Sequence, residues 1–316
     1  MCRDRTPLMR YGSRPTPVGT FITRKPLSTA LNLTPYAFVL PATVLLFIII
    51  LAPIVLVIAL SFTDYTLGSL DWSFASLDNY QDLFSDKVFV RSLRNTLLYV
   101  AIVVPTSVFL ALIVAICINQ RIRTKRFYEV VYFLPVTSTF VAMAIVWEFL
   151  FHSRIGPLNQ FLALLGYDRV GFLTDPEVAL ISLAVVGVWK LIGFNVILYL
   201  AGLSSIPADI YEAASIDGMD GGLDRLLRIT WPMLGPTTMF VAITSSISAF
   251  QVFEPVAVLT KGGPQGSTDV VLYQMYLESF QYFEIGYGAS ITVVFLAVIL
   301  AFSLLQLRYF DGKVHY

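Results

Sequence analysis

The side chains of this sequence that could do chemistry are a few polar and charged groups set within long apolar stretches. Lys190 lies near the middle of one stretch, and Glu148 and Glu254 lie toward the ends of two others. A charge in hydrocarbon is costly, so such groups face a protein interior or a water-filled cavity, or else reach the interface with water. Their chemistry is ionic contact and hydrogen bonding with a polar solute. The sequence allows a pair between Lys190 and a carboxylate, but spacing alone does not identify its partner.

The stretch near 233–260 is the most polar of the long apolar ones. Serines there also satisfy local carbonyls or join helices, so they have a structural alternative. Gln251 between Phe250 and Phe253 is a stronger candidate, because an amide bonds hydroxyl groups while aromatic faces cover apolar C–H surfaces. The candidate residues of a solute pathway are Lys190, Asn195, Ser246, Phe250, Gln251, Phe253 and Glu254.

Motifs for catalysis or cofactor binding are absent from the sequence. No G-x-x-x-x-G-K-[ST] run is present to cradle phosphates. The two histidines, His152 and His315, are not spaced as metal ligands. The formal net charge of zero argues against a nucleic-acid footprint. We therefore expect no catalytic residue, no metal, no cofactor in this chain and no nucleic-acid partner.

Composition indicates the elements that must position these groups. The chain is 57% hydrophobic and 13% charged, whereas a soluble domain carries about a quarter charged residues. Six runs reach the roughly 20 residues that cross about 30 Å of hydrocarbon. Runs this continuous satisfy their backbone in lipid as helices. The sequence predicts an all-α membrane protein with about six transmembrane helices, kinked at internal prolines such as Pro135. The spans are expected near 36–61, 95–118, 128–151, 178–203, 233–260 and 287–307.

The distribution of Lys and Arg predicts the orientation. Basic residues concentrate in 1–35 and in the short segment between the second and third spans, and cytoplasmic loops carry such an excess. Both termini are therefore expected in the cytoplasm. Prolines throughout 1–35 break helices, so this segment is interpreted as a flexible cytoplasmic tail that precedes a membrane domain over 36–316.

The segment 204–232, between the fourth and fifth spans, is expected to form a cytoplasmic helix–turn–helix. Ser205 is a candidate N-cap, Pro207 suits a first helical turn, and Gly218 suits a helix end. A second short helix is expected before Pro232. A hairpin lying on lipid would favour basic residues on its polar face, but this segment is acidic. We therefore expect a protein to dock on it, with Ala213 and Ala214 allowing close approach.

The loop 62–94 is the longest one expected outside. Its acids and aromatic residues, among them Trp72 and Phe74, predict a small packed cap. Two roles for its aromatic side chains stay open: anchoring at the membrane interface, or docking of an external partner.

Several of these segments resemble a known family. Glu212-Ala213-Ala214, Asp217-Gly218 and Ile229-Thr230-Trp231-Pro232 resemble the EAA loop of ABC-importer permeases. Two departures occur: ten residues instead of nine separate Gly218 from Ile229, with the extra residue expected within 220–222, and Trp231 replaces the usual Leu. Further segments are similar to the first permease of carbohydrate-uptake systems, the group of the maltose and glycerol-3-phosphate permeases. These segments are 61–65, 77–80, 95–96, 249–253 and 259–264.

The resemblance implies a permease subunit of an ATP-driven, binding-protein-dependent importer of a sugar or related polyol, in a bacterial-type cytoplasmic (inner) membrane. Its implied partners are a second homologous permease, two ATPase subunits that hold ATP and Mg, an extracytoplasmic solute-binding protein and the lipid bilayer. The chain would form half of the translocation pathway. The coupling residues that the resemblance implies are Glu212, Ala213, Ala214, Asp217, Gly218, Ile229 and Pro232.

Two other classes of function agree less well with the sequence. A stand-alone secondary transporter or channel for a small polar solute would favour paired intramembrane acids or an inverted repeat of broken helices, and neither is evident in the sequence. A membrane enzyme is disfavoured by the lack of clustered His, Cys or paired carboxylates. The sparse charge favours a neutral polyol over a phosphate, which would call for Arg or Lys clusters.

Overall fold

The computed structural model describes residues 34–121, 123–219 and 222–311. Residues 1–33 of the predicted tail therefore lie outside the described residues, as do Asp220, Gly221 and His315. The chain divides into two compact units, Met1–Ile50 and Leu51–Tyr316. In the described part, secondary structure is almost entirely helical, with one isolated β-bridge between Thr63 and Phe74.

The first unit contributes α1 (Thr34–Leu46) and most of the π-helical turn η1 (Phe47–Leu51). The second unit continues with α2 (Ala52–Leu60). The segment Tyr36–Leu60 is long and apolar enough to cross a membrane, in agreement with the predicted span 36–61. Its most apolar window has no buried residue, so its side chains are available to lipid or to another chain.

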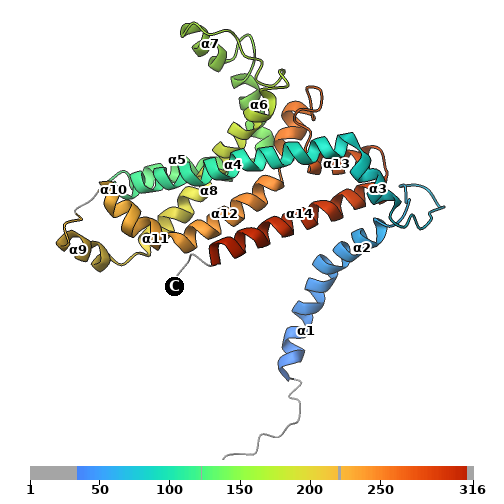
Figure 1. Ribbon diagram of the computed structural model, residues 1–316, viewed down its shortest axis with the longest axis horizontal. Coiled ribbons are helices and arrows are strands. Elements are labelled where there is room, and N and C mark those ends of the chain that lie inside the picture. The colour runs from blue at the N-terminus through green and yellow to red at the C-terminus, as the bar shows by residue number, and fades with distance from the viewer. Residues whose placement is uncertain (1–33, 122, 220–221, 312–316) are drawn as a thin grey trace, which may run out of the picture. The chain divides into compact units, whose positions relative to one another are not determined.

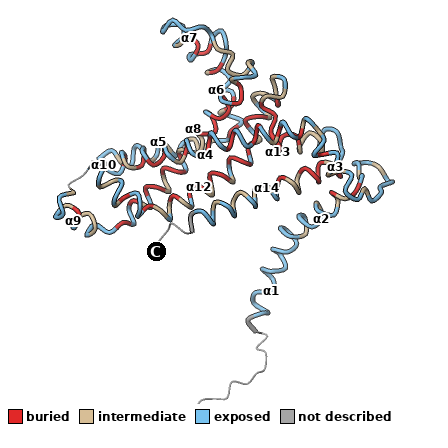
Figure 2. The backbone as a smooth tube through the Cα atoms, in the orientation of Figure 1, coloured by how far each residue is buried: buried red, intermediate tan, exposed pale blue. Residues whose placement is uncertain are grey.

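Four long helices form the bundle of the second unit: α4 (Lys87–Asn119), α8 (Ala179–Ser204), α12 (Gly235–Phe250) and α14 (Ile285–Asp311). Helix α4 packs on α8 and α12, and α12 packs on α14 (Figure 1). Buried residues follow the facing sides of these helices (Figure 2). Two apolar clusters form this core, one around Tyr99 and Phe250, the other around Tyr199 and Leu234.

Helix α4 begins eight residues before the predicted span 95–118. Asp86 caps it by accepting a hydrogen bond from the Val88 backbone N–H at 2.8 Å. A carboxylate N-cap stabilises a polar first turn that hydropathy alone does not detect. The additional turns carry Lys87, Arg91 and Arg94.

The predicted span 128–151 is divided between two helices, and the kink expected at Pro135 is a complete break. Helix α5 (Lys125–Thr137) and α6 (Phe140–Leu150) are bent by 100° at the break between them. The hydroxyls of Thr137 and Ser138 both donate to the Leu134 carbonyl. Such side-chain bonds replace backbone bonds at a helix end, so the chain turns after Pro135 instead of being only kinked by it. Beyond α6 the short helix α7 (Pro157–Leu164) follows.

The predicted span 233–260 is also interrupted, because α12 ends at Phe250 and a separate helical segment begins at Glu254. Pro255 has no N–H to donate to the Gln251 carbonyl, and its ring disfavours a continuing helix there. A π-helical turn η3 (Val256–Thr260), α13 (Val271–Tyr276) and a further π-helical turn η4 (Leu277–Gln281) follow.

Before α12 lie α10 (Gly222–Arg225), the π-helical turn η2 (Leu226–Thr230) and α11 (Trp231–Met233), and this segment is bent by 70° relative to α12. Within the described residues, four helices are long and apolar enough to span a membrane, or up to six if each bent pair is one span. The prediction of an all-α membrane protein with about six spans is confirmed. The cytoplasmic placement of both termini stays a prediction.

Two further short helices complete the fold, α3 (Asp78–Ser85) and α9 (Ala208–Ile216). Next to α3, the Asn79 amide donates to the backbone carbonyls of Ser61 and Thr63 at 2.9 and 2.8 Å, and Tyr80 bonds Ser61 at 2.7 Å. These bonds tie the loop after α2 to α3 and form a folded cap. Trp72 and Phe74 are exposed on it, so the two roles considered for its aromatic residues both remain predictions.

Candidate translocation cavity and coupling loop

An ion pair joins two of the predicted pathway residues. The Lys190 ammonium lies 3.1 Å from Glu254 Oε2, and the two side chains are 41% and 51% exposed. Lys190 comes from the middle of α8, and Glu254 follows the break after α12. The same ammonium lies 5.4 Å from the centre of the Phe140 ring at the start of α6, which adds a cation–π contact. The end of α12 therefore brings together two charges that lie 64 residues apart in sequence.

These two side chains line a cavity of about 360 Å³. Gln251, Phe253 and Ser248 line it from the end of α12, while Tyr99 and Phe140 contribute aromatic walls. Helix α8 can pass close to α4 here because position 187 is glycine, where any side-chain carbon would collide with the Tyr99 hydroxyl. The cavity combines amide, hydroxyl, carboxylate and ammonium groups with aromatic faces, a set suited to binding a small polar solute.

The other three predicted pathway residues are buried in the helix packing. Asn195 donates to Ser107 at 3.5 Å and accepts from Ser245 at 3.1 Å, which joins α4, α8 and α12. The Ser246 hydroxyl donates to the Ala242 carbonyl and accepts from Gln306. Phe250 packs against Phe302, with ring centres 5.2 Å apart. In this conformation Asn195, Ser246 and Phe250 hold helices together, and only a rearrangement would expose them to a solute.

Helix α9 carries the residues of the predicted coupling loop. It ends as expected at Gly218, which has φ +81°. The Gly218 N–H bonds the Ser215 carbonyl, and the Met219 N–H bonds the Ala214 carbonyl. These two bonds form a Schellman motif, which requires a left-handed residue at this position. The predicted N-cap at Ser205 is wrong, because Ser205 ends α8 and Pro207 occupies the N-cap of α9.

One face of α9 is available to another molecule. Glu212, Ala213 and Asp217 are exposed, and the adjacent Ile216 is 87% exposed. Ala214 is buried against the protein itself, so of the two alanines only Ala213 offers a close approach to a partner. In the segment that follows, Ile229 is half-buried and Pro232 is exposed.

Two side-chain contacts that the sequence did not predict brace α9. The Arg225 guanidinium lies 4.3 Å from the centre of the Tyr211 ring, and the Tyr211 hydroxyl lies 3.3 Å from the Thr230 hydroxyl. Tyr211 directly precedes Glu212-Ala213-Ala214, and an aromatic residue at this place was the sequence feature that could have indicated these contacts. The π-helical turn over Leu226–Thr230 is a place where a helix accommodates one additional residue. Asp220 and Gly221, where the extra residue was expected, lie outside the described residues.

His152 has a local structural contact. Its Nδ1 accepts hydrogen bonds from the backbone N–H groups of Arg154 and Ile155 at 3.2 and 3.3 Å. Among the described residues, no group of three or more His, Cys, Asp or Glu side chains is arranged to hold a metal ion.

A family model described as "Binding-protein-dependent transport system inner membrane component" matches residues 84–316. The chain belongs to this family. The matched range includes the cavity between α4, α6, α8 and the end of α12, together with the whole segment 204–232. The family is that of ABC transporter permeases, as the resemblance of the EAA-like segment predicted, and the α1 and α2 helices precede the matched range.

Individual relatives agree with this membership. The chain is 32% identical over 287 residues to the "Probable ABC transporter permease protein YurN" of Bacillus subtilis, covering 89% of this chain and 98% of the relative. It is 33% identical over 289 residues to the "Lactose transport system permease protein LacF" of Rhizobium radiobacter, covering 90% and 96%. A chain in the crystal structure of a bacterial ABC transporter involved in alginate import shares the fold, with TM-score 0.74, 24% identity and coverage of 89% and 96%.

Proposed function

We propose that this chain is the membrane-spanning permease subunit of an ATP-driven, binding-protein-dependent importer of a sugar or related polyol. The family match over 84–316 carries the proposal. Relatives are named for transport of lactose and of sn-glycerol-3-phosphate, and this supports a carbohydrate-type solute. The chain forms half of the pathway and pairs with a second, homologous permease in the cytoplasmic (inner) membrane.

The solute contacts the cavity at the end of α12. Gln251 and the Lys190–Glu254 pair provide directional hydrogen bonds to hydroxyl groups, and Phe253 and Phe140 cover apolar C–H surfaces. The ammonium and carboxylate neutralise each other, so the cavity has no surplus charge to favour an anion. A volume of about 360 Å³ lies at the small end of the range for small-molecule sites. These features favour a neutral polyol of modest size.

The exposed face of α9 receives the force that drives transport. Glu212, Ala213 and Asp217 contact an ATPase subunit, which binds ATP and Mg and performs the hydrolysis. Glu212 pairs with a basic residue of that subunit, and Ala213 permits close backbone approach. Movement of α9 is passed to α8, which directly precedes it, and opens the cavity alternately to the two sides of the membrane. An extracytoplasmic solute-binding protein delivers the solute.

A charge reversal at Glu212 tests this proposal. Glu212→Arg is expected to reduce co-purification of the ATPase subunits and ATP-driven uptake roughly tenfold or more, as for one broken charge pair at an interface. Asp168→Arg is the matched control, because it reverses another exposed carboxylate, in the loop after α7. Unchanged ATPase binding and uptake in Glu212→Arg would contradict the proposal.

A further inference from the structure

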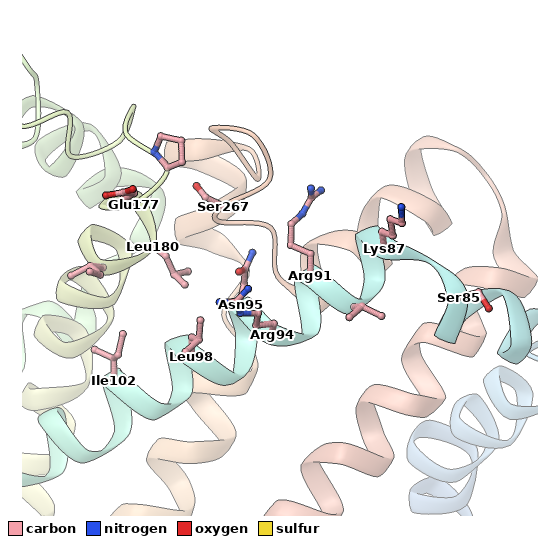
Figure 3. Close-up of a pocket in the computed structure, with 13 residues that line it drawn as sticks. Ser85, Lys87, Arg91, Arg94, Asn95, Leu98, Ile102, Glu177, Leu180 and Ser267 are labelled. Atoms are coloured by element: carbon pink, nitrogen blue, oxygen red, sulfur yellow. The ribbon is translucent and has the colours of Figure 1, made fainter.

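A second, larger cavity of about 850 Å³ lies at the N-terminal end of α4 (Figure 3), and neither Lys190 nor Glu254 is among the residues that line it. Lys87, Arg91 and Arg94 line it from the first two turns of α4. Across from them lie Glu177, before α8, and Ser267, in the loop after η3. Three cationic side chains face one carboxylate, so the cavity carries a net positive charge.

Within the described residues, the three cations form no salt bridge. Lys87 and Arg94 are exposed, and neither has a carboxylate within ion-pair distance among the described residues. Arg91 lies against Gly266, where a side-chain carbon would collide with its guanidinium, and its charge acts on the nearby Asp269. The Ser267 hydroxyl is buried and has no hydrogen-bond partner in the described part of the chain. Free ammonium, guanidinium and hydroxyl donors together suit an anion with several acceptor oxygens.

The deeper wall of the same cavity is apolar. Leu98 and Ile102 follow the cations along α4 (Figure 3), and Ile181, in the first turn of α8, also lines the cavity. All three side chains are exposed. Arg94 and Ile102 are separated by about 12 Å along the helix, at 1.5 Å per residue. The cavity therefore combines a cationic rim with an uncovered apolar wall one to two turns deeper.

We propose that this cavity binds an anionic phospholipid, with the headgroup phosphate on Lys87, Arg91 and Arg94 and an acyl chain along Leu98, Ile102 and Ile181. A helix of the length of α4 extends about 50 Å, while the hydrocarbon core measures about 30 Å. Its first turns thus extend beyond the hydrocarbon core, where Lys and Arg side chains can pair with headgroup phosphates. An acidic side chain of a protein or a free anion would pair with the cations but leave the apolar wall uncovered.

Native mass spectrometry of the purified full-length chain tests the proposal, with phosphatidylglycerol and phosphatidylcholine of identical acyl chains as probes. Phosphatidylglycerol should be retained preferentially, and Lys87→Gln/Arg94→Gln should weaken its retention roughly tenfold or more. Arg91 is left unchanged because it also contacts the loop at Gly266. Arg169→Gln is the control, since it removes an exposed cation that lines a different cavity. Variants are compared only where circular dichroism matches the parent chain.

Two further measurements distinguish a lipid headgroup from a free anion. Ile181→Gln should weaken phosphatidylglycerol retention while leaving weak binding of inorganic phosphate unchanged, because it alters only the apolar wall. Displacement of phosphatidylglycerol by inorganic phosphate at similar concentration would overturn the proposal in favour of a free-anion site. Equal retention of the two lipids would overturn it as well. The proposal would also be overturned if Lys87→Gln/Arg94→Gln retained phosphatidylglycerol but no longer captured the solute-binding protein. That result would indicate that the cations bind a carboxylate of that protein.

Discussion

At the scale of single residues, the Lys190–Glu254 pair gives the sharpest prediction about the cavity. Neutralising either side chain alone, by Lys190→Gln or Glu254→Gln, leaves an uncompensated charge at the cavity wall. Each single variant is expected to reduce ATP-driven uptake in proteoliposomes roughly tenfold, and the double variant should lose less than the two single losses combined. The pair is half exposed, so thermal stability should change by less than about 1 kcal/mol.

Glu148→Gln is the matched control for this cycle. Glu148 is an exposed acid on α6 and forms no ion pair among the described residues. ATP-driven uptake by the Glu148→Gln variant should equal that of the parent chain. Strictly additive losses in the Lys190 and Glu254 variants would show that the two side chains act independently during transport.

Asp269 predicts a dependence of stability on pH. Burial raises the pKa of this carboxyl from 3.8 to about 6, with the nearby Arg91 opposing the rise and Asp86 adding to it. The folded protein then holds the proton to a higher pH than the unfolded chain does. The contribution of Asp269 to stability is complete below about pH 4 and is lost as the pH rises through about 6.

The variant Asp269→Asn measures this effect. It keeps a neutral side chain at every pH, so its melting temperature should vary less than that of the parent chain between pH 4 and pH 8. The parent should lose roughly 1–3 kcal/mol more over this interval. Asp168→Asn, which changes an exposed carboxylate, should follow the parent profile. If the melting temperatures of the parent chain and of Asp269→Asn changed in parallel with pH, the effect of Asp269 on stability would be refuted.

At the scale of elements, sequence predicted the helices better than their interruptions. The span 178–203 agrees with α8 (Ala179–Ser204) within one residue at each end, because a long uninterrupted apolar run has one favourable structure in lipid. The places where helices break, after Thr137 and after Phe250, were predicted less accurately. Hydropathy averages over the hydroxyls after Pro135 and over Pro255, although these local groups end the helices.

The same distinction holds for the candidate site. Gly218 was predicted from local chemistry, since a residue with positive φ at a helix end is usually glycine. The contact between Lys190 and Glu254 depends instead on how α8 and the end of α12 pack together, and on the break at Gln251. Long-range packing also determines that Asn195 and Ser246 are buried. Residue type and spacing do not contain that information.

Helix α9 provides a prediction at this scale. In Gly218→Ala the added side chain meets no atom within 4 Å, so the expected cost of about 1 kcal/mol comes from the positive φ alone. The end of α9 should show faster hydrogen exchange and weaker ATPase binding, while the melting temperature of the membrane bundle stays constant. Gly166→Ala is a matched control, with φ +83° and equally open surroundings in another loop. Equal ATPase binding in both variants would contradict the role of α9.

At the scale of the whole molecule, α8 connects the cavity to α9, the helix that we propose contacts the ATPase. Lys190 lies midway along α8, and only Ser205, Ile206 and Pro207 separate its end from α9. A helix transmits displacement with little loss, and α8 is packed along its length against α4. A shift of α9 therefore reaches the cavity as a movement of α8 relative to α4 and α12. The buried hydrogen bonds of Asn195 to Ser107 and Ser245 join α8 to α4 and α12 on this path.

The dependence on partners gives the last prediction. The chain reconstituted alone in liposomes should not transport sugar, because in the proposed assembly it supplies half of the pathway, and its sequence has no phosphate-binding loop. Adding the second permease and the ATPase subunits should produce uptake that requires hydrolysable ATP, measured with labelled solute. Cavity residues such as Gln251 should affect uptake in the full assembly, whereas the isolated chain should show no difference between variants. Uptake by the chain alone, driven by an ion gradient, would instead identify a stand-alone secondary transporter, and the exposed face of α9 would then need another partner.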